Sequence, residues 1–401
     1  MPRSEEMLFK LACRATRLIF FAFGFGIASW APMVPFVKTK LQANDAELGL
    51  VLLASGMGAL LSMPLAAFLV HNFGTRLMTV LWSMIVVIIF PFLVIADTSV
   101  TVAFVLFLFG ISTGFWNVSI NAHAVQVESK ASIPIMSGLH CFFSTGGLCG
   151  ALTVSALLEL GFSLLFCALA VSVTMGLIIL LNWKNLLPME KRAIPSCDEP
   201  RVSRRDGFSF PDIRVLLLGT LCFASFMTEG SMLDWSAEFL RTTLNYSASI
   251  AGIGFALFST GMVLGRFTGD RIIHWKGTMF LFQVGSFLAA SGLVLVVTAG
   301  IGMQEMLGFF LIGLGASNIV PILFSASGRV PSASPSFNLT IVTTFGYMGI
   351  LIGPAFIGFI AEATSLSFAF GCISVFLFAV GFSGRYVLKD LVIDRYISIQ
   401  S

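Results

Sequence analysis

The chain of 401 residues is 57% hydrophobic and 11% charged, with a mean hydropathy of +0.95. Apolar runs of membrane-spanning length recur from end to end, so the composition predicts a polytopic helical membrane protein and excludes a soluble domain. The net charge of +3 is too small to indicate a nucleic-acid partner. The seven cysteines include no Cys-x-x-Cys pair and predict neither a disulfide framework nor a metal site.

Twelve apolar segments follow one another, and each is predicted to be a membrane-spanning helix. The first six lie at about 16–37, 47–70, 76–96, 99–123, 132–158 and 162–183. The other six lie at about 213–240, 248–270, 277–299, 304–327, 336–361 and 366–388. The fold class predicted is therefore an all-α polytopic membrane protein.

A single long connection, residues 184–212, divides these segments into two sets. It carries six Lys or Arg residues and four prolines, a composition typical of a solvated linker. We expect an N-terminal six-helix bundle at 1–183, this linker, and a C-terminal six-helix bundle at 213–401. With the N-terminus inside, all but three of the 23 basic residues lie in the cytoplasm, and only Lys38, Lys40 and Arg241 face out. The linker and both termini are therefore predicted to be cytoplasmic.

The two halves of the sequence resemble each other at ordered positions, as expected for duplicated helical units. The matches are Ala28-Ser29-Trp30-Ala31 with Leu233-Asp234-Trp235-Ser236, the loop 70–75 with 273–278, and Gly146-x-x-x-Gly150 with Gly349-x-x-x-Gly353. We interpret the two glycine pairs as surfaces where helices pack closely.

The seventh predicted span holds Glu229, Asp234 and Glu238 within an apolar run. An acid near the centre of a membrane helix costs roughly 2.5–3.5 kcal/mol on insertion, so it indicates a compensating partner or a function. Glu229 lies about halfway along the span, the depth at which acids carry protons in transporters. Glu229 and Asp234 are the proton-coupling candidates, although five residues place them roughly 140° apart around an ideal helix. The alternative is that a polar group on a neighbouring helix holds Glu229.

Six further residues are candidates for binding a polar solute, because each places a polar or aromatic group inside a span. They are Trp30, Asn117, Asn121, His140, Trp235 and Asn318. Asn117 and Asn121 are one helical turn apart and share a face. Asn318 precedes Pro321, where a helix interruption is expected. Hydrogen bonds between helices, for the amides and the histidine, and positions at the membrane boundary, for the tryptophans, remain as alternatives.

Three stretches carry a resemblance to a known family: 229–237 (Glu-Gly-Ser-Met-Leu-Asp-Trp-Ser-Ala), 134–140 and 315–321. In them the chain resembles the fucose-permease-like branch of the major facilitator superfamily, and most nearly its YbjJ-like group of bacterial inner-membrane transporters. The family's loop Gly-x-x-x-Asp-Arg-x-Gly-Arg-Arg is reduced here, with His71 in place of the acid.

The resemblance implies two pseudo-symmetric six-helix bundles in the bacterial inner membrane. It also implies a latch between the bundles, for which the candidates are His71, Gly74, Arg76, Arg266, Asp270 and Arg271. Related transporters of this branch use acids in their first and fourth spans, whereas this chain offers Asn117 in the fourth and no acid in the first. The coupling role is therefore expected in the seventh span.

The sequence predicts a secondary active transporter rather than an enzyme, working as a monomer without a cofactor. The expected cargo is a small polar organic solute, sugar-like by resemblance, moved by alternating access in symport with protons. No Gly-x-x-x-x-Gly-Lys-Ser/Thr loop is present, which argues against ATP as the energy source. Two alternatives remain: a proton-antiport exporter of a metabolite or drug, and a transporter-derived ligand sensor that moves nothing.

Overall fold

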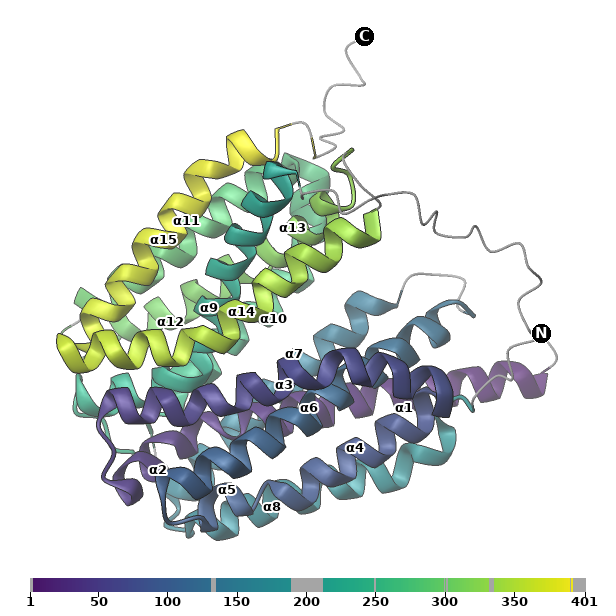
Figure 1. Cartoon of the computed structure of the whole chain (residues 1–401), viewed down its shortest axis with the longest axis horizontal. Coiled ribbons are helices and arrows are strands. Elements are labelled where there is room, and N and C mark those ends of the chain that lie inside the picture. The colour runs from purple at the N-terminus through teal and green to yellow at the C-terminus, as the bar shows by residue number, and fades with distance from the viewer. Residues whose placement is uncertain are drawn as a thin grey trace.

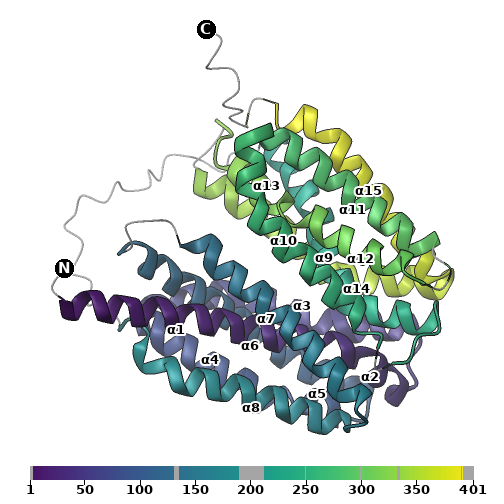
Figure 2. The same ribbon diagram turned by 180° about the vertical axis from the view of Figure 1, so that it is seen from behind.

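The computed structural model describes residues 3–130, 135–188, 212–248, 250–298, 300, 302–331, 335–389 and 391. Figures 1 and 2 show two groups of helices, one from each half of the chain. Most of the predicted linker 184–212, the start of the fifth predicted span and both chain ends lie outside the described residues.

In the first half, the first predicted span consists of α1 (Arg3–Ala28), the 3-10 turn η1 (Ala31–Met33) and α2 (Val34–Leu41). It is followed by α3 (Asp45–Phe73), α4 (Thr75–Ile89), α5 (Phe92–Ile95), α6 (Ser99–Glu128), α7 (Met136–Glu159), α8 (Leu164–Asn182) and the 3-10 turn η2 (Trp183–Asn185). The second half holds α9 (Ile213–Thr242), α10 (Ile253–Lys276), α11 (Thr278–Thr298), α12 (Gln304–Ala316), α13 (Ile319–Ser327), α14 (Pro335–Ala363) and α15 (Leu366–Val387).

Eleven segments of the described chain are long and apolar enough to cross a membrane. The one predicted span not among them, the eighth at about 248–270, corresponds to α10, a helix of 24 residues whose second half carries Arg266, Arg271 and Lys276 and is therefore less apolar. The predicted fold class, an all-α polytopic membrane protein, is confirmed. The tenth predicted span differs from a continuous helix, because it breaks at Ser317–Asn318. Pro321 has no N–H to bond the Ser317 carbonyl, so the helix cannot continue without interruption.

The turns that follow α3 and α10 have the same backbone conformation. Gly74 has φ 85° and Gly277 has φ 90°, values that a residue with a side chain adopts only with strain. Each glycine N–H closes its helix by donating to a carbonyl four residues earlier, Val70 O or Ile273 O, at 2.9 Å. The loop match seen in the sequence therefore reflects one turn used twice.

The matched glycine pairs lie where helices approach most closely. A Cβ atom at Gly146 would collide with the Phe21 carbonyl oxygen of α1, and one at Gly349 with the Phe223 carbonyl oxygen of α9. The packing of α7 on α1 in the first half is thus repeated by α14 on α9 in the second. This confirms the interpretation of the glycine pairs as close-packing surfaces.

Gly146→Ala is expected to destabilise the protein by about 1–3 kcal/mol, because backbone atoms of α1 must move to admit the methyl group. The matched control is Gly138→Ala on the same helix, where nothing lies within 4 Å of an added Cβ. The apparent melting temperature of the purified protein in detergent should fall for Gly146→Ala and stay or rise for Gly138→Ala. Equal melting temperatures would contradict the packing described here.

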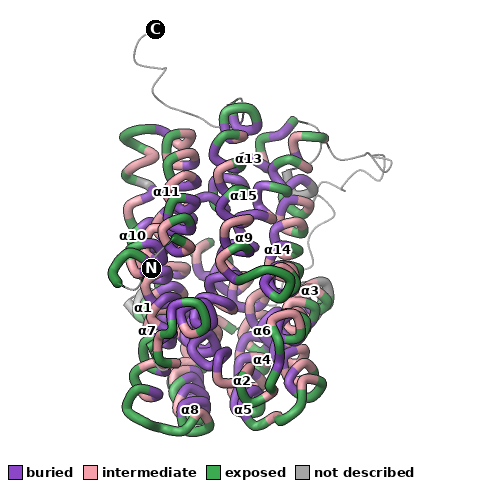
Figure 3. The backbone as a smooth tube through the Cα atoms, turned by 90° about the vertical axis from the view of Figure 1, so that its left-hand side faces the viewer, coloured by how far each residue is buried: buried purple, intermediate pink, exposed green. Residues whose placement is uncertain are grey.

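The two groups of helices meet at one end of the molecule and diverge toward the other (Figure 1). We call "the joined end" the end where α2, the start of α3 and the ends of α9 and α14 meet, and "the far end" the end where α1 begins. α3 packs on α14, α7 on α10, and α2 on α9 across the two halves. In Figure 3 the buried residues lie along the inward faces of these helices.

The buried core follows the same pattern. One apolar cluster runs through both halves and includes Trp30, Trp235, Leu240 and Phe255. A second cluster, around Val215, draws all its residues from the second half. The halves therefore share a core near the joined end, whereas α9, α13 and α15 pack on their own near the far end.

Candidate functional site

Among the described residues, two hydrogen bonds join the halves between the far end and the middle of the helices. The Asn117 Nδ2 of α6 donates to the Tyr347 hydroxyl of α14 at 3.2 Å, and the Arg266 Nη1 of α10 donates to the Ser144 hydroxyl of α7 at 2.6 Å. These four residues lie about 12–18 Å along their helices from the far end. Together with Asn121 and Phe226, they make up what we call the central cluster.

Amide and aromatic groups surround the first of these bonds. Asn121 donates from Nδ2 to the Asn117 Oδ1 at 2.7 Å and to the Asn117 carbonyl at 2.9 Å, so the two predicted amides act as one unit. Phe226 of α9 stacks on the Tyr347 ring with centroids 5.7 Å apart and planes 16° apart. Both asparagines remain half-buried. The central cluster therefore presents hydrogen-bonding groups beside the edge of an aromatic pair.

Glu229 lies in α9 about 24 Å from Ile213 and about 20 Å from Thr242, close to the midpoint of the helix. Its carboxylate is half-buried and, within the described part of the chain, accepts no hydrogen bond and forms no ion pair. Among the described residues, Arg266 of α10 is a cation close enough to act on this carboxylate electrostatically. Glu229 is therefore an intramembrane acid that lies within the electrostatic reach of a cation but is not paired with it.

Arg266 also lies within electrostatic range of His140 on α7, whose ring packs edge-on against Phe20 with centroids 5.4 Å apart. The structure thus places His140 of α7 and Glu229 of α9 within electrostatic range of the same cation, Arg266 of α10. Arg266 was expected in the latch between the bundles, and the structure places it in the central cluster.

Asp234 is the second proton-coupling candidate, and it projects elsewhere. α9 stays helical through Gly230, so the Glu229 and Asp234 side chains point about 140° apart. The Asp234 carboxylate is half-buried, and no described residue donates to it or pairs with it. The structure does not bring the two acids together.

The joined end is held by ion pairs that link α2, α3 and α9. Lys38 Nζ lies 2.7 Å from the Glu238 Oε1 across the two halves, and it also pairs with Asp45. The Glu238 side chain is 0% exposed, and its second oxygen lies 3.7 Å from the Arg241 Nη1. Arg241 in turn donates to the Pro35 carbonyl at 2.7 Å. We call these residues the joined-end ion network; its two cations and two carboxylates balance in charge.

Trp30 and Trp235 lie in the core of the joined end, 4% and 0% exposed. Within the described residues their indole N–H groups have no hydrogen-bond partner. A Cβ added at Gly358 of α14 would lie 3.2 Å from the Trp235 ring, which shows how closely α14 covers it. In this conformation both tryptophans are therefore buried, and neither indole N–H donates to a described residue of the central cluster.

Asn318 stands at the helix break of the tenth span, as expected. Its Nδ2 donates to the Gly265 carbonyl of α10 at 2.8 Å and to the Ser317 hydroxyl at 2.9 Å. These bonds connect α10 to the break between α12 and α13, within the second half. The geometry agrees with the alternative of an interhelical hydrogen bond at this position.

The remaining latch candidates lie toward the far end. His71 is exposed at the end of α3, and Gly74 forms the turn described above. The Arg76 guanidinium lies 5.1 Å from the Trp183 ring centroid, and that of Arg271 lies 5.6 Å from the Phe267 ring centroid. Asp270 is part of α10, and its side chain lies outside what the structure describes.

Sequence reasoning missed Ser144, Phe226 and Tyr347. Tyr347 is one of only four tyrosines and stands in the middle of an apolar span, which is a usable signal for a polar contact. Ser144 and Phe226 resemble many other residues in these helices. Their roles depend on partners that are distant in sequence.

The chain matches the Major Facilitator Superfamily over residues 18–334. It belongs to this family of membrane transporters, in agreement with its all-helical architecture, and it is a transporter rather than an enzyme.

Two relatives align with nearly the whole chain. An uncharacterized MFS-type transporter of Yersinia pestis is 43% identical over 377 residues, covering 94% of this chain and 95% of the relative. The membrane protein MosC of Rhizobium meliloti is 33% identical over 376 residues, covering 93% of this chain and 88% of the relative.

Solved transporters share the fold at low identity. A mutant of the nucleoside transporter NupG superposes with a TM-score of 0.74 at 12% identity, covering 94% of this chain and 99% of NupG. A bacterial homologue of the human lysosomal transporter Spinster, in an inward-facing and occupied conformation, superposes with a TM-score of 0.69 at 16% identity, covering 97% of each chain.

Proposed function

We propose that this transporter couples the movement of a small polar organic solute to protons, with Glu229 as the coupling acid. The observation that carries the proposal is a carboxylate at mid-depth of α9 that has no partner among the described residues and lies within the field of Arg266, which itself hydrogen-bonds Ser144 of the other half. An intramembrane acid without a structural partner marks an ion pathway by default. Arg266 lies within the field of Glu229 and also donates to Ser144 of the other half. A change of charge at Glu229 therefore acts on a bond that must break when the halves separate.

The central cluster favours a hydroxylated ring as solute. The Asn117 and Asn121 amides donate to and accept from hydroxyl groups, and the stacked Phe226 and Tyr347 rings offer an apolar surface beside them. A sugar or a sugar-bearing compound has both kinds of surface. The fucose-permease-like resemblance supports the same class, and NupG, which shares the fold, is itself a transporter of nucleosides.

We assign the joined end to the outside of a bacterial inner membrane, with both termini in the cytoplasm. The joined end holds Lys38, Lys40 and Arg241, the three basic residues expected outside. Apart from Arg266 in the central cluster, the other Lys and Arg residues that the structure describes lie toward the far end. The conformation is then closed to the outside by the joined-end ion network. In the opposite conformation the far ends of the halves meet, and His71, Arg76, Asp270 and Arg271 are the candidates for that contact.

The proposal is tested by ligand-induced thermal stabilisation of the purified protein with a library of sugars, nucleosides, carboxylates and amines. A ligand that binds the folded protein raises its apparent stability as ligand concentration exceeds Kd. We expect a sugar-like compound to stabilise the wild type by an amount that changes between two pH values, and to stabilise Glu229→Gln equally at both.

Other outcomes separate the alternatives. A ligand whose effect is independent of pH in the wild type contradicts proton coupling through Glu229. An amphipathic amine as the only ligand favours the antiport exporter. Binding without uptake or exchange in vesicles favours a sensor.

Tyr347→Phe and Asn117→Ala are each expected to weaken binding of that compound about 2- to 10-fold, because one hydrogen bond contributes about 0.5–1.5 kcal/mol. The matched control is Tyr386→Phe, since Tyr386 is 88% exposed near the end of α15. Titration calorimetry gives the Kd of each variant. An unchanged Kd for both cluster variants would place the solute elsewhere.

A further inference from the structure

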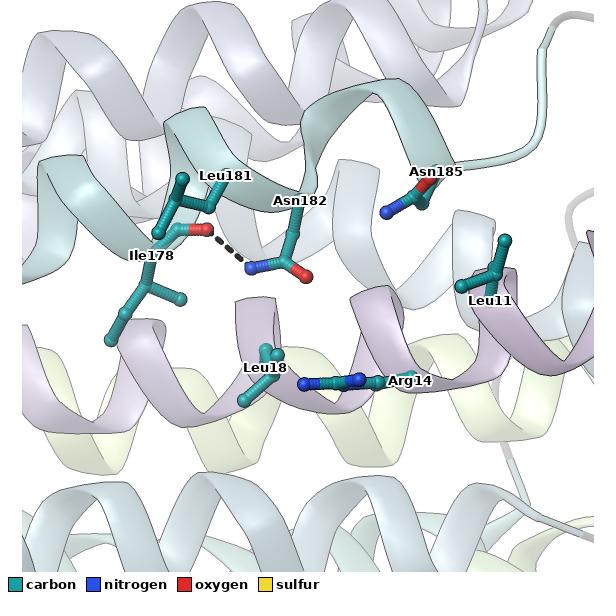
Figure 4. Close-up of a pocket in the computed structure, with 7 residues that line it drawn as sticks. All are labelled: Leu11, Arg14, Leu18, Ile178, Leu181, Asn182 and Asn185. Carbon is teal, nitrogen blue, oxygen red and sulfur yellow. Dashed lines mark hydrogen bonds between the residues drawn. The ribbon is translucent and has the colours of Figure 1, made fainter.

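The outer surface of the first half carries a cavity that the transport site does not use. It has a volume of about 400 Å³ and opens between α1 and the end of α8 (Figure 4). Its polar lining is Arg14, Asn182 and Asn185, and its apolar lining includes Leu11, Leu18 and Leu181. Both walls come from the first half, so the cavity lies apart from the contact between the halves.

The cavity lies at the level of the lipid headgroups. Arg14 precedes Lys38 of the joined end by 24 residues, about 36 Å of helix, whereas the hydrocarbon layer is about 30 Å thick. Leu18 is one turn deeper than Arg14 on α1. Leu181 is 76% exposed on α8, and Trp183 follows it in η2, as expected for an aromatic residue at the membrane boundary. The polar lining therefore meets the headgroup layer, and Leu18 and Leu181 face the acyl chains.

The charge of the cavity is uncompensated. The Arg14 side chain is exposed, and no described residue forms a hydrogen bond or an ion pair with its guanidinium. Asn182 donates to the Ile178 carbonyl at 2.8 Å, while the Asn185 amide has no described partner and projects over the same space (Figure 4). The lining thus offers one cation and one free amide donor, and it includes no acid.

We propose that this cavity binds an anionic phospholipid of the membrane. The guanidinium and the Asn185 amide donate to the lipid phosphate, and an acyl chain lies along Leu18 and Leu181. A guanidinium binds phosphate through paired N–H groups, and basic pockets between membrane helices select anionic headgroups. A zwitterionic lipid carries a cation in its own headgroup, so the Arg14 charge contributes less to its binding.

The test uses the purified full-length protein in detergent and measures the apparent Kd for phosphatidylglycerol, phosphatidylcholine and soluble glycerol 3-phosphate by native mass spectrometry. The wild type should bind phosphatidylglycerol in preference to the other two. Arg14→Ala should weaken that binding about fivefold, the effect of one basic residue at an anionic surface. Arg385→Ala is the matched control, because Arg385 is an exposed arginine in the last turn of α15, on the other half.

A second variant, Asn185→Asp, places an acid in the cavity and should weaken phosphatidylglycerol binding even if Arg14→Ala folds poorly. Equal binding by wild type and both cavity variants would overturn the site. Equal affinity for phosphatidylcholine would overturn the selection by charge. Complete competition by glycerol 3-phosphate would overturn the phospholipid in favour of a free phosphate compound.

Discussion

Glu229→Gln is expected to abolish gradient-driven accumulation of the solute while leaving exchange of solute for solute across the membrane. Glutamine keeps the size and hydrogen-bonding capacity of the side chain but cannot release or take up a proton. The halves therefore still alternate around the solute, without a proton to set the direction. Proteoliposomes that carry an imposed membrane potential or pH gradient measure accumulation, and preloaded proteoliposomes measure exchange.

The expected loss is large. A potential of 100 mV acting on one proton supplies about 2.3 kcal/mol, equivalent to roughly 50-fold accumulation, and the variant should approach equal concentrations on both sides. The comparison is Asp234→Asn on the same helix, an acid that also lacks a described partner but points about 140° away from Glu229. We expect Asp234→Asn to keep coupled accumulation. If Asp234→Asn uncouples transport and Glu229→Gln does not, the assignment of the coupling acid is wrong.

Lys38→Ala is expected to open the joined end and shift the population away from the conformation described here. The substitution leaves the fully buried Glu238 carboxylate without its partner at 2.7 Å. Removing one partner of a buried ion pair costs roughly 3–5 kcal/mol, and the Arg241 guanidinium at 3.7 Å argues for the lower end of that range. About 3 kcal/mol changes the ratio of two conformations by more than 100-fold.

Spin labels on exposed residues measure this shift. Thr39 and Thr243 report the separation at the joined end, and Asn72 and Lys276 report it at the far end. In Lys38→Ala the first distance should lengthen and the second shorten. Adding Glu238→Gln removes the unpaired charge and should return part of the population to the starting conformation.

Lys40→Ala is the control for the loss of a lysine in the same helix. Lys40 pairs at 2.6 Å with Asp97, which is 80% exposed and lies in the same half. A surface pair of this kind contributes about 0–1 kcal/mol and does not join the halves. Distances that change equally in Lys40→Ala and Lys38→Ala would show that the joined-end ion network does not hold the two halves together.

Several features of the candidate site were visible in the sequence because they depend on local order. The acid at position 229 stands out since few charged residues occur inside apolar runs. Asn117 and Asn121 share a face because helical spacing dictates it, and their hydrogen bond followed. The pairs Gly146/Gly150 and Gly349/Gly353 indicated close packing, because two glycines four residues apart on one helix leave a flat surface.

Other features required partners that are remote in the chain. Ser144 became part of the central cluster through Arg266, 122 residues later, and Tyr347 through Asn117, 230 residues earlier. Lys38 looked like an exposed outer lysine, and its partner Glu238 lies 200 residues away. No local pattern encodes such pairings, because either residue alone is compatible with a solvated position.

The sequence by itself determined the membrane class, the helical spans and the duplication, since apolar length, helical period and glycine spacing are local properties of the chain. The tertiary structure decided which polar groups meet. It buried Glu238 against Lys38, left Glu229 and Asp234 without a partner among the described residues, and bonded Arg266 to Ser144 of the other half. The physical reason is that a charge inside a membrane protein is stabilised or left unpaired by the helices that pack beside it, and only the packing of the two halves sets those neighbours.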